Sequence, residues 1–330
     1  EPVMKTAFVT GATGFTGGHL ARRLLKEGWR VRALVRPSSD HASLKELGCD
    51  IVPGDLCLPE RYRERLRGAH AVFHIAAYYR DQGSSGLFYR VNVEGTRALL
   101  DACIEQGVGR FIHCSTVGVH GEIAEPPADE KAPFAPGDVY QKSKLEAELI
   151  VQDYLSSGKI KGSIFRPVGI YGPGDKRFLK LFKMAQSRYT LIIGRGEVLY
   201  QMTYIDDLID GILLLAAKPQ AEGEVFILTG PEYTSITGLL CRISRVLGKP
   251  LRVIRLPVAP LYGLAFASEK LCGLLGIKPL LYRRRLDFFL KDRAFSSVKA
   301  MKLLGYAPQV TLEEGLRRTA EWYKKMNWLR

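Results

Sequence analysis

The sequence predicts an α/β protein with a doubly wound parallel sheet and a smaller, mostly helical C-terminal region. Over the first half of its 330 residues, short apolar runs alternate with segments of helical spacing. Parallel strands are joined by crossover helices that cover both faces of their sheet, so this alternation is typical of that fold. The chain also opens with an apolar strand that runs directly into a glycine-rich turn and a helix.

The individual elements follow from length and periodicity. Apolar runs of a few residues near the N-terminus have the length of buried strands. A helix is expected over 19–27 because its leucines recur at helical spacing, and Gly28 is a natural C-terminal stop. The predicted strands cover 7–9, 31–35, 50–52, 71–75, 111–115, 162–166 and 225–228, and the later helices cover 96–106, 140–155 and 207–217.

Gly11, Gly14 and Gly17 follow the first strand at intervals of three residues. A chain that turns from strand to helix, lets a pyrophosphate approach its backbone and packs that helix closely needs residues without a Cβ at these steps. The free N–H groups and the positive end of the helix dipole then bind phosphates. In this strand–turn–helix context the glycines predict a Rossmann-type dinucleotide-binding domain.

The alternation weakens after about Arg166, where Pro and Gly cluster over 166–174. Such a segment leaves the sheet and forms loops at a binding site. We therefore expect an NAD(P)-binding domain over 1–166, to which 205–230 return. The substrate-binding region would consist of 167–204 and 231–330.

The composition is globular with a basic excess. Lys and Arg number 48 against 34 acidic residues, a formal net charge of +14. Such a surface attracts anions, but the chain has neither zinc-finger spacing nor a basic-aromatic RNA motif, so nucleic acid is not an expected partner. Six cysteines without a C-x-x-C pair predict reduced thiols in a cytoplasmic protein, and no metal site is expected.

The most apolar stretch covers 256–277, interrupted by Pro260, Glu269 and Lys270. No run of 18 uninterrupted apolar residues occurs, so a membrane-spanning helix is not expected. A core or lid helix is the main interpretation. Peripheral contact with a membrane is the alternative, because Lys and Arg lie nearby.

Further motifs occur at 54–56, 73–77, 92–96, 115–116, 140–144 and 166–174. Together with the G-x-x-G-x-x-G spacing they resemble the extended short-chain dehydrogenases/reductases, the NAD-dependent epimerase/dehydratase family, and in particular its 3β-hydroxysteroid dehydrogenase-like branch. The resemblance implies a homodimer, formed through a four-helix contact. With the reasoning on the glycine turn and the second strand, it gives as cofactor-binding residues Gly11, Thr13, Gly14, Phe15, Thr16, Gly17, Arg36, Asp55, Leu56, Ala76, Ala77, Tyr140, Lys144 and Pro167.

Arg36 directly follows the second predicted strand, where the adenosine ribose should lie. An acidic residue at this place binds the 2′-hydroxyl of NAD, whereas an Arg accommodates the 2′-phosphate of NADP. The first acid is Asp40, and Ser38 and Ser39 could add hydroxyl contacts. The sequence therefore favours NADP(H), although an Arg36 stacked on adenine would also be compatible with NAD.

Tyr140 and Lys144 are four residues apart and would share one helix face. A neighbouring ammonium and the positive nicotinamide ring should together lower the pKa of a tyrosine from about 10, so that it can act as general acid and base at the substrate oxygen. A hydroxyl at the preceding strand end can align that oxygen. Counting back from 119–121, which resembles a family motif, favours Thr116, while Ser115 remains the alternative.

The segment 166–175 resembles the R-P-x-G-I-[YF]-G-x-G-D of sterol dehydrogenases, whereas sugar-nucleotide epimerases usually have Asn in place of Gly169. This predicts hydride transfer with a secondary alcohol or ketone on a hydrophobic, sterol-like or acyl substrate. An epimerase is the main alternative, with Arg195 holding a diphosphate. A dehydratase is disfavoured because Val117 and Gly118 stand where it would have acids. A non-catalytic cofactor-binding protein is the last alternative.

Other polar residues are expected to be structural. Asn92 would cap a helix or tether the backbone, and Asp206 and Asp207 would cap the helix that follows them. His74 would be a packed strand residue, and His120 is assigned no chemical role.

Overall fold

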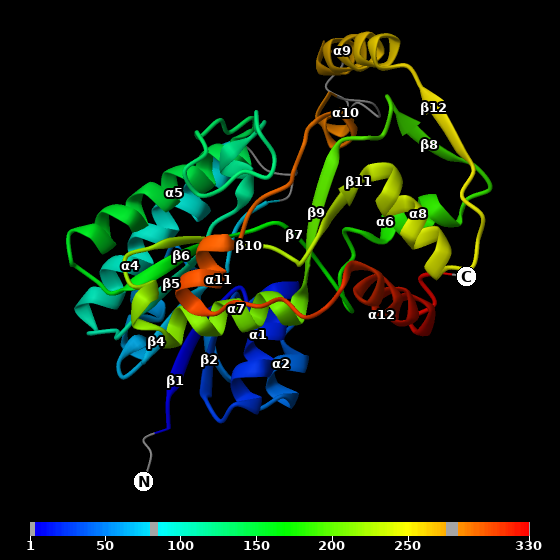
Figure 1. Cartoon of the computed structure of the whole chain (residues 1–330). Helices are drawn as coiled ribbons and strands as arrows, with labels where there is room; N and C mark the ends of the chain where they lie inside the picture. Colours follow the sequence, from blue (N-terminus) through cyan, green and yellow to red (C-terminus); the bar gives the residue numbers. More distant parts are fainter. Residues whose placement is uncertain (1–3, 80–84, 275–282, 330) are drawn as a thin grey trace.

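The computed structural model describes residues 4–79, 85–274 and 283–329, and a seven-stranded parallel sheet forms its centre (Figure 1). The strand order is β10-β6-β5-β4-β1-β2-β3. Strands β2 and β3 are added on one side of β1, and β4, β5, β6 and β10 on the other, so the strand order reverses between β1 and β4, where such sheets bind ligands. The predicted doubly wound fold is confirmed. The strands are β1 Thr6–Thr10, β2 Arg30–Val35, β3 Asp50–Pro53, β4 Ala71–His74, β5 Phe111–Cys114, β6 Gly162–Pro167 and β10 Val225–Leu228.

Helices cover both faces of this sheet. In β1, Ala7 and Val9 belong to the core shared with α1 and α7, whereas Phe8 belongs to the core shared with α4 and α5. This alternation buries the whole strand, as a parallel sheet between two helical layers requires. The helices are α1 Phe15–Lys26, α2 Ala42–Glu46, α4 Gly95–Glu105, α5 Val139–Ser156, α7 Ile205–Ala217 and α11 Val298–Leu304.

Two smaller sheets and further helices form the second region. A three-stranded sheet has the order β11-β9-β7, and β12 pairs with β8. The C-terminal part is mostly helical, as expected, but it also contributes β11 and β12. The elements are β7 Gly169–Tyr171, β8 Thr190–Ile193, β9 Leu199–Tyr204, β11 Tyr233–Ser235, β12 Val253–Leu256, α6 Leu179–Gln186, α8 Ile236–Val246, α10 Arg283–Leu290 and α12 Leu312–Lys325. The short helix α3 Ser85–Tyr89 contacts α5.

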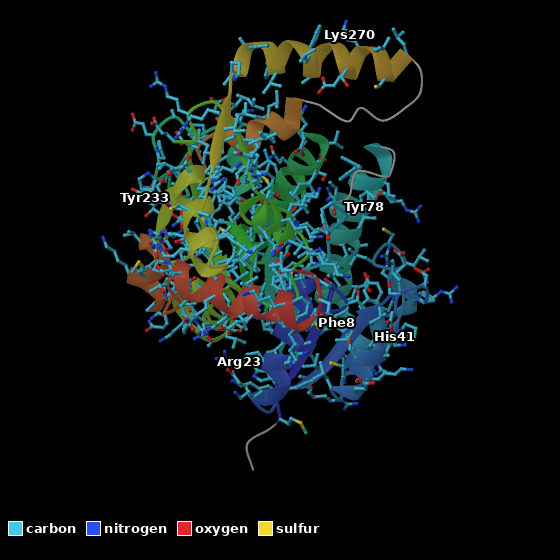
Figure 2. All side chains as sticks on the ribbon, turned by 90° about the vertical axis from the view of Figure 1, so that its right-hand side faces the viewer. Phe8, Arg23, His41, Tyr78, Tyr233 and Lys270 are labelled. Carbon is cyan, nitrogen blue, oxygen red and sulfur yellow. The ribbon has the colours of Figure 1, made fainter. Side chains whose placement is uncertain are left out.

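Helix α9 (Val258–Leu274) lies far from the central sheet, at the top of Figure 1, and Figure 2 shows Lys270 on it. Leu264, Phe266 and Leu271 on this helix are exposed. Within the described ranges, no helix combines the length and apolarity needed to cross a membrane. The peripheral membrane contact suggested for 256–277 stays a prediction, and residues 275–277 lie outside the described part.

Asp207 differs from its expected role. Its carboxylate accepts hydrogen bonds from the backbone N–H groups of Gln309 at 2.9 Å and Val310 at 3.0 Å. It therefore ties the C-terminal segment to α7, and the N-cap of α7 is Tyr204 without a side-chain cap. The capping interpretation fails for Asp207 because its partners lie about a hundred residues away in sequence.

Candidate active site

The turn after β1 requires glycine for two physical reasons. Gly11 has φ +75°, and a Cβ there would lie 2.7 Å from the backbone nitrogen of Ala76. A Cβ on Gly17 would lie 2.2 Å from the carbonyl oxygen of Gly11. The close approach places Ala76, just after β4, against the turn at the reversal point of the sheet. Only residues without side chains permit this packing.

The first turn of α1 is left open for an anion. Gly14 is the N-cap and offers no side-chain oxygen to the free N–H groups of the helix. Thr13 and Gly14 are exposed, and Phe15 and Thr16 are half-buried. The turn therefore fits the pyrophosphate of a dinucleotide, bound by backbone N–H groups and the positive end of the helix.

The residues expected at the adenosine end follow β2 and β3. Arg36 is exposed directly after β2. The Asp55 carboxylate accepts a hydrogen bond of 2.9 Å from the Cys57 N–H and so shapes the turn after β3. Leu56 is buried, and a Cβ on Gly95 would lie 3.0 Å from its side chain.

Tyr140 and Lys144 lie in the first turns of α5, whose N-cap is Asp138. Lys144 is buried, and its Nζ donates a hydrogen bond of 2.6 Å to the carbonyl oxygen of Cys114 at the end of β5. This bond joins the helix to the strand end that carries the candidate hydroxyls. Tyr140 is half-buried.

The electrostatics of this pair differ from the expected pattern. Burial raises the pKa of Tyr140 above its ordinary value, while the positive charge of Arg177 opposes the rise. Burial also lowers the pKa of Lys144. The predicted lowering of the Tyr140 pKa by Lys144 is not found in the protein alone, because desolvation of the phenolate dominates. Tyr140 is therefore a neutral phenol.

The two candidate hydroxyls have different partners. Ser115 is buried and donates a hydrogen bond of 2.5 Å to Glu148 Oε2. Thr116 is half-buried, and its Oγ1 accepts a hydrogen bond of 3.1 Å from the Gly118 N–H. The Thr116 proton is thus not used in that bond.

Glu148 and Arg166 form a buried ion pair that the sequence analysis missed. Arg166 donates to both carboxylate oxygens of Glu148 and, at 3.0 Å, contacts Nε2 of the buried His120. The pair lies beneath Ser115, and Glu148 is four residues after Lys144 on α5. That spacing, Tyr-x-x-x-Lys-x-x-x-Glu, was a signal that could have indicated a shared helix face.

The loop after β7 packs against the glycine turn. His19 on α1 contacts the carbonyl oxygen of Pro173 at 3.0 Å. The Arg177 guanidinium lies 5.7 Å from the centre of the Phe15 ring and donates to Asp175 at 2.7 Å. Pro167, the last expected cofactor residue, is buried at the end of β6.

Asn92 and His74 have the structural surroundings that were expected of them. The Asn92 amide bonds both backbone groups of Tyr78 and the hydroxyl of Ser143, at 2.7–2.9 Å, so it tethers a loop. His74 lies between Thr10 and Thr96, at 2.8 Å from each hydroxyl. Burial lowers the pKa of His74 to about 3, so it is neutral.

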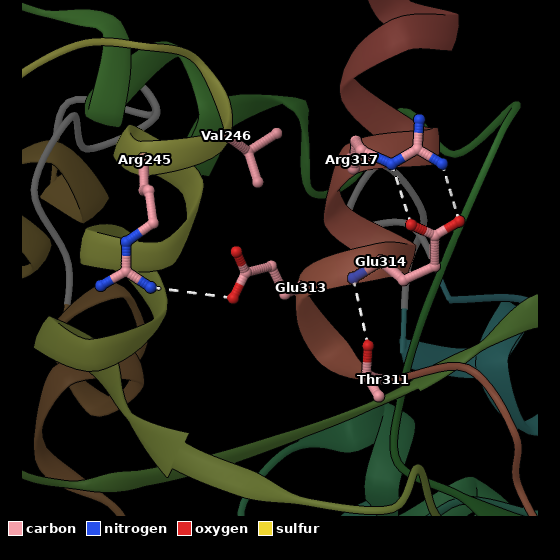
Figure 3. Close-up of a pocket in the computed structure, with 6 residues that line it drawn as sticks. All are labelled: Arg245, Val246, Thr311, Glu313, Glu314 and Arg317. Carbon is pink, nitrogen blue, oxygen red and sulfur yellow. Dashed lines mark hydrogen bonds and ion pairs between the residues drawn. The ribbon is translucent and has the colours of Figure 1, made fainter.

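A separate surface pocket lies between α8 and α12 (Figure 3). Arg245 pairs with Glu313 at 3.7 Å, and Arg317 pairs with Glu314 at 2.8 Å. Because these charges are paired with each other, we assign the pocket no chemical role. Over the ranges that the structure describes, no three metal-binding side chains cluster.

Comparison with known proteins agrees with this geometry. Residues 7–228 match the NAD dependent epimerase/dehydratase family. A decarboxylating sterol-4-alpha-carboxylate 3-dehydrogenase from Mus musculus is 29% identical over 96% of this chain and 90% of its own length. A 2-alkyl-3-oxoalkanoate reductase from Stenotrophomonas maltophilia is 28% identical over 94% of this chain and 97% of its own. The crystal structure of gox2253 has a TM-score of 0.84 at 31% identity and covers 99% of this chain and 100% of its own. The chain therefore belongs to the NAD-dependent epimerase/dehydratase family and is an oxidoreductase of the extended short-chain dehydrogenase/reductase type.

Proposed function

We propose that this oxidoreductase transfers a hydride between C4 of a nicotinamide cofactor, preferably NADP(H), and a secondary alcohol or ketone on a hydrophobic acid. The supporting observation is that the Thr116 turn packs against the first turn of α5, which carries Tyr140. A Cβ on Gly118 would lie 3.2 Å from Gln141 Cγ and 3.3 Å from Thr116 Oγ1. The phenol and the Thr116 hydroxyl proton are thus carried by two elements in direct contact, the start of α5 and the turn after β5. When bound, the cofactor supplies or accepts the hydride.

Tyr140 acts as the general acid in the reductive direction. Its raised pKa keeps the phenol protonated at neutral pH, so it can donate a proton to the ketone oxygen as that oxygen gains charge. Thr116 donates a hydrogen bond to the same oxygen and aligns it. Lys144 is anchored to the Cys114 carbonyl and has two further N–H donors for the cofactor ribose.

Gly169 favours a dehydrogenase over a sugar-nucleotide epimerase. A Cβ at this position would lie 3.1 Å from Phe178 Cζ and 3.1 Å from the Tyr200 hydroxyl. The Asn that epimerases usually have here would therefore displace one of the rings. Arg195, the alternative diphosphate ligand, is exposed in the turn between β8 and β9. A sugar-nucleotide epimerase remains the second candidate only because the chain belongs to a family that includes epimerases.

The relatives support an acidic, hydrophobic substrate. The names of the mouse and Stenotrophomonas relatives describe a sterol carboxylate and an oxoalkanoate, which are both acids with an apolar body. We extend this class to the present chain. The preference for NADP(H) depends on Arg36, whose exposed guanidinium follows β2 and suits a phosphate.

The proposed function is tested by cofactor retention and exchange. Freshly purified protein is denatured, any released nucleotide is identified, and the empty protein is titrated with NADPH and NADH. We expect little retained nucleotide and tighter binding of NADPH, followed by turnover of ketones that rises with their hydrophobicity. Stoichiometric, tightly held NAD would instead indicate an epimerase, which keeps its hydride through the reaction.

We further propose a homodimer in the cytoplasm. Ile104 on α4 and Val139 and Leu149 on α5 are exposed, which supports a helical contact between two copies. The six cysteines are all free, as in a reducing compartment. Light scattering of the purified protein tests the dimer.

A further inference from the structure

Three aromatic side chains form a wall beside β7, which we call the aromatic wall. The ring centres of Phe178 and Tyr200 are 6.2 Å apart, and those of Tyr200 and Phe288 are 5.2 Å apart. Gly169 lies against the first two rings. Tyr200 is only 9% exposed, yet its hydroxyl makes no hydrogen bond with any residue in the described part of the chain. Its hydroxyl can therefore donate a hydrogen bond to a ligand.

Two arginines flank this wall. Arg293 lies 5.9 Å from the centre of the Phe288 ring, and its backbone N–H bonds Leu199 at 2.7 Å. Among residues 4–79, 85–274 and 283–329, no acid pairs with its guanidinium. Arg177 directly precedes Phe178, its Nε is paired with Asp175 at 2.7 Å, and its Nη2 donates to the carbonyl oxygen of Ile170, next to Gly169, at 2.8 Å. Arg293 and the paired Arg177 thus lie next to residues of the aromatic wall, which also contains the Tyr200 hydroxyl.

The charges connect this surface to the proposed catalytic phenol. Burial raises the pKa of Tyr200, and the positive charges of Arg293 and Arg177 oppose that rise. Arg177 has the same effect on Tyr140. The Arg177 guanidinium is therefore close enough to act on both phenols.

We propose that Arg177, Arg293 and the Tyr200 hydroxyl form an oxyanion subsite that binds the acid group of the substrate. The inference rests on the proposed function and names the residues that would select an acid. Arginine binds planar carboxylates and phosphates through paired N–H donors, and a phenol adds a third donor. The aromatic wall would then cover the apolar part of the substrate next to its acid group. The same donors could bind the diphosphate of a sugar nucleotide, so the test must distinguish a carboxylate ligand from a diphosphate ligand.

The test measures equilibrium binding to the NADPH-loaded protein by titration calorimetry, because the reduced cofactor cannot oxidise the alcohol probe and no turnover occurs during the titration. Three probes are compared: a 2-alkyl-3-hydroxyalkanoate, its methyl ester and UDP. The variants are Arg293→Gln and Arg177→Gln, with Arg293→Lys as the conservative change. Arg252→Gln, an exposed arginine before β12, is the matched control. NADP⁺ affinity is measured for every variant and reports on folding.

We expect the acid to bind about 10- to 100-fold more tightly than its ester, the usual range for a hydrogen bond to a charged group. Arg293→Gln and Arg177→Gln should remove this preference while ester binding stays the same, Arg293→Lys should retain part of it, and Arg252→Gln should retain all of it. If UDP competes with the acid, and if Arg293→Gln no longer binds UDP, the subsite is supported but its ligand is a diphosphate. Equal binding of acid and ester by the unmodified protein overturns the proposal. If the acid binds but is not oxidised when NADP⁺ is supplied instead of NADPH, the proposed function is contradicted and the subsite is retained.

Discussion

The hydroxyl of Ser115 donates a hydrogen bond of 2.5 Å to the carboxylate of Glu148. This contact gives Ser115 a structural partner that the adjacent hydroxyl of Thr116 does not share. Ser115 faces the buried Glu148–Arg166 pair. Thr116 lies on the other side of the strand end, and its Oγ1 only accepts a bond, from the Gly118 N–H. Substitutions of Ser115 and Thr116 should therefore have opposite effects on stability and on activity.

Thr116→Val should lower kcat by about 100-fold or more, because it removes the donor that aligns the substrate oxygen. Its thermal stability should stay close to that of the unmodified protein. Ser115→Ala should leave kcat within a few-fold but destabilise the fold by roughly 1–3 kcal/mol, because a buried carboxylate loses a donor. Steady-state kinetics and urea unfolding measure the two effects. The opposite pattern would make Ser115 the catalytic hydroxyl.

Tyr140→Phe should reduce kcat by at least about 100-fold, the usual scale for general acid–base catalysis. NADPH affinity should stay within a few-fold, because the ring that packs at the start of α5 is retained. Fluorescence titration of NADPH and single-turnover reduction measure both quantities. Unchanged biological function in this variant would favour a non-catalytic cofactor-binding protein.

The framework could be predicted because its signals are local. The strand Val225–Leu228 has the expected bounds, and the glycine spacing located the turn at the reversal point of the sheet. Helix boundaries were less accurate. Helix α1 begins at Phe15 instead of His19, because the glycine turn feeds directly into a helix whose first turn lacks an apolar periodicity.

The charged parts of the site could not be predicted because they depend on contacts between distant segments. The spacing on α5 indicates only that Glu148 shares a face with Tyr140 and Lys144, and its ion pair depends on Arg166, which comes from β6. Arg177 reaches the glycine turn only because the loop after β7 folds back onto Phe15. Burial by distant segments raises the pKa of Tyr140 in the protein without cofactor, whereas the expected lowering also involves the nicotinamide ring and stays a prediction for the loaded enzyme.

Arg36→Glu should exchange the cofactor preference. The exposed guanidinium after β2 is expected to bind the 2′-phosphate, whereas a carboxylate at this place repels it and accepts a hydrogen bond from the NAD ribose. The Kd for NADPH should rise about 10-fold or more, and the Kd for NADH should stay the same or fall. Titration of both nucleotides measures this. A Kd for NADPH that does not change would show that Arg36 does not contact the phosphate.

His113→Phe should make the protein less sensitive to acid. Both ring nitrogens of His113 are buried without a hydrogen-bond partner in the described structure, and its ring stacks on Phe111. Burial, with help from the charge of Lys144, holds the pKa of His113 well below 6.5. A histidine whose pKa is lower in the folded state stabilises the fold above pH 6.5, and this stability is lost as pH falls below 6.5, because only the unfolded chain takes up the proton.

For each such histidine the free energy of unfolding should fall by about 1.4 kcal/mol per pH unit, or about 2 kcal/mol between pH 6.5 and 5. His74, with a pKa of about 3, makes the same contribution in both proteins. Urea unfolding at pH 7 and pH 5 should therefore show a drop that is about 2 kcal/mol smaller for His113→Phe. His41→Gln, at the edge of the molecule in Figure 2, is the matched control and should behave like the unmodified protein. An equal drop for His113→Phe and the unmodified protein would mean that His113 is solvated or bonded by water in the folded state, since only then does its proton uptake not differ between the two states.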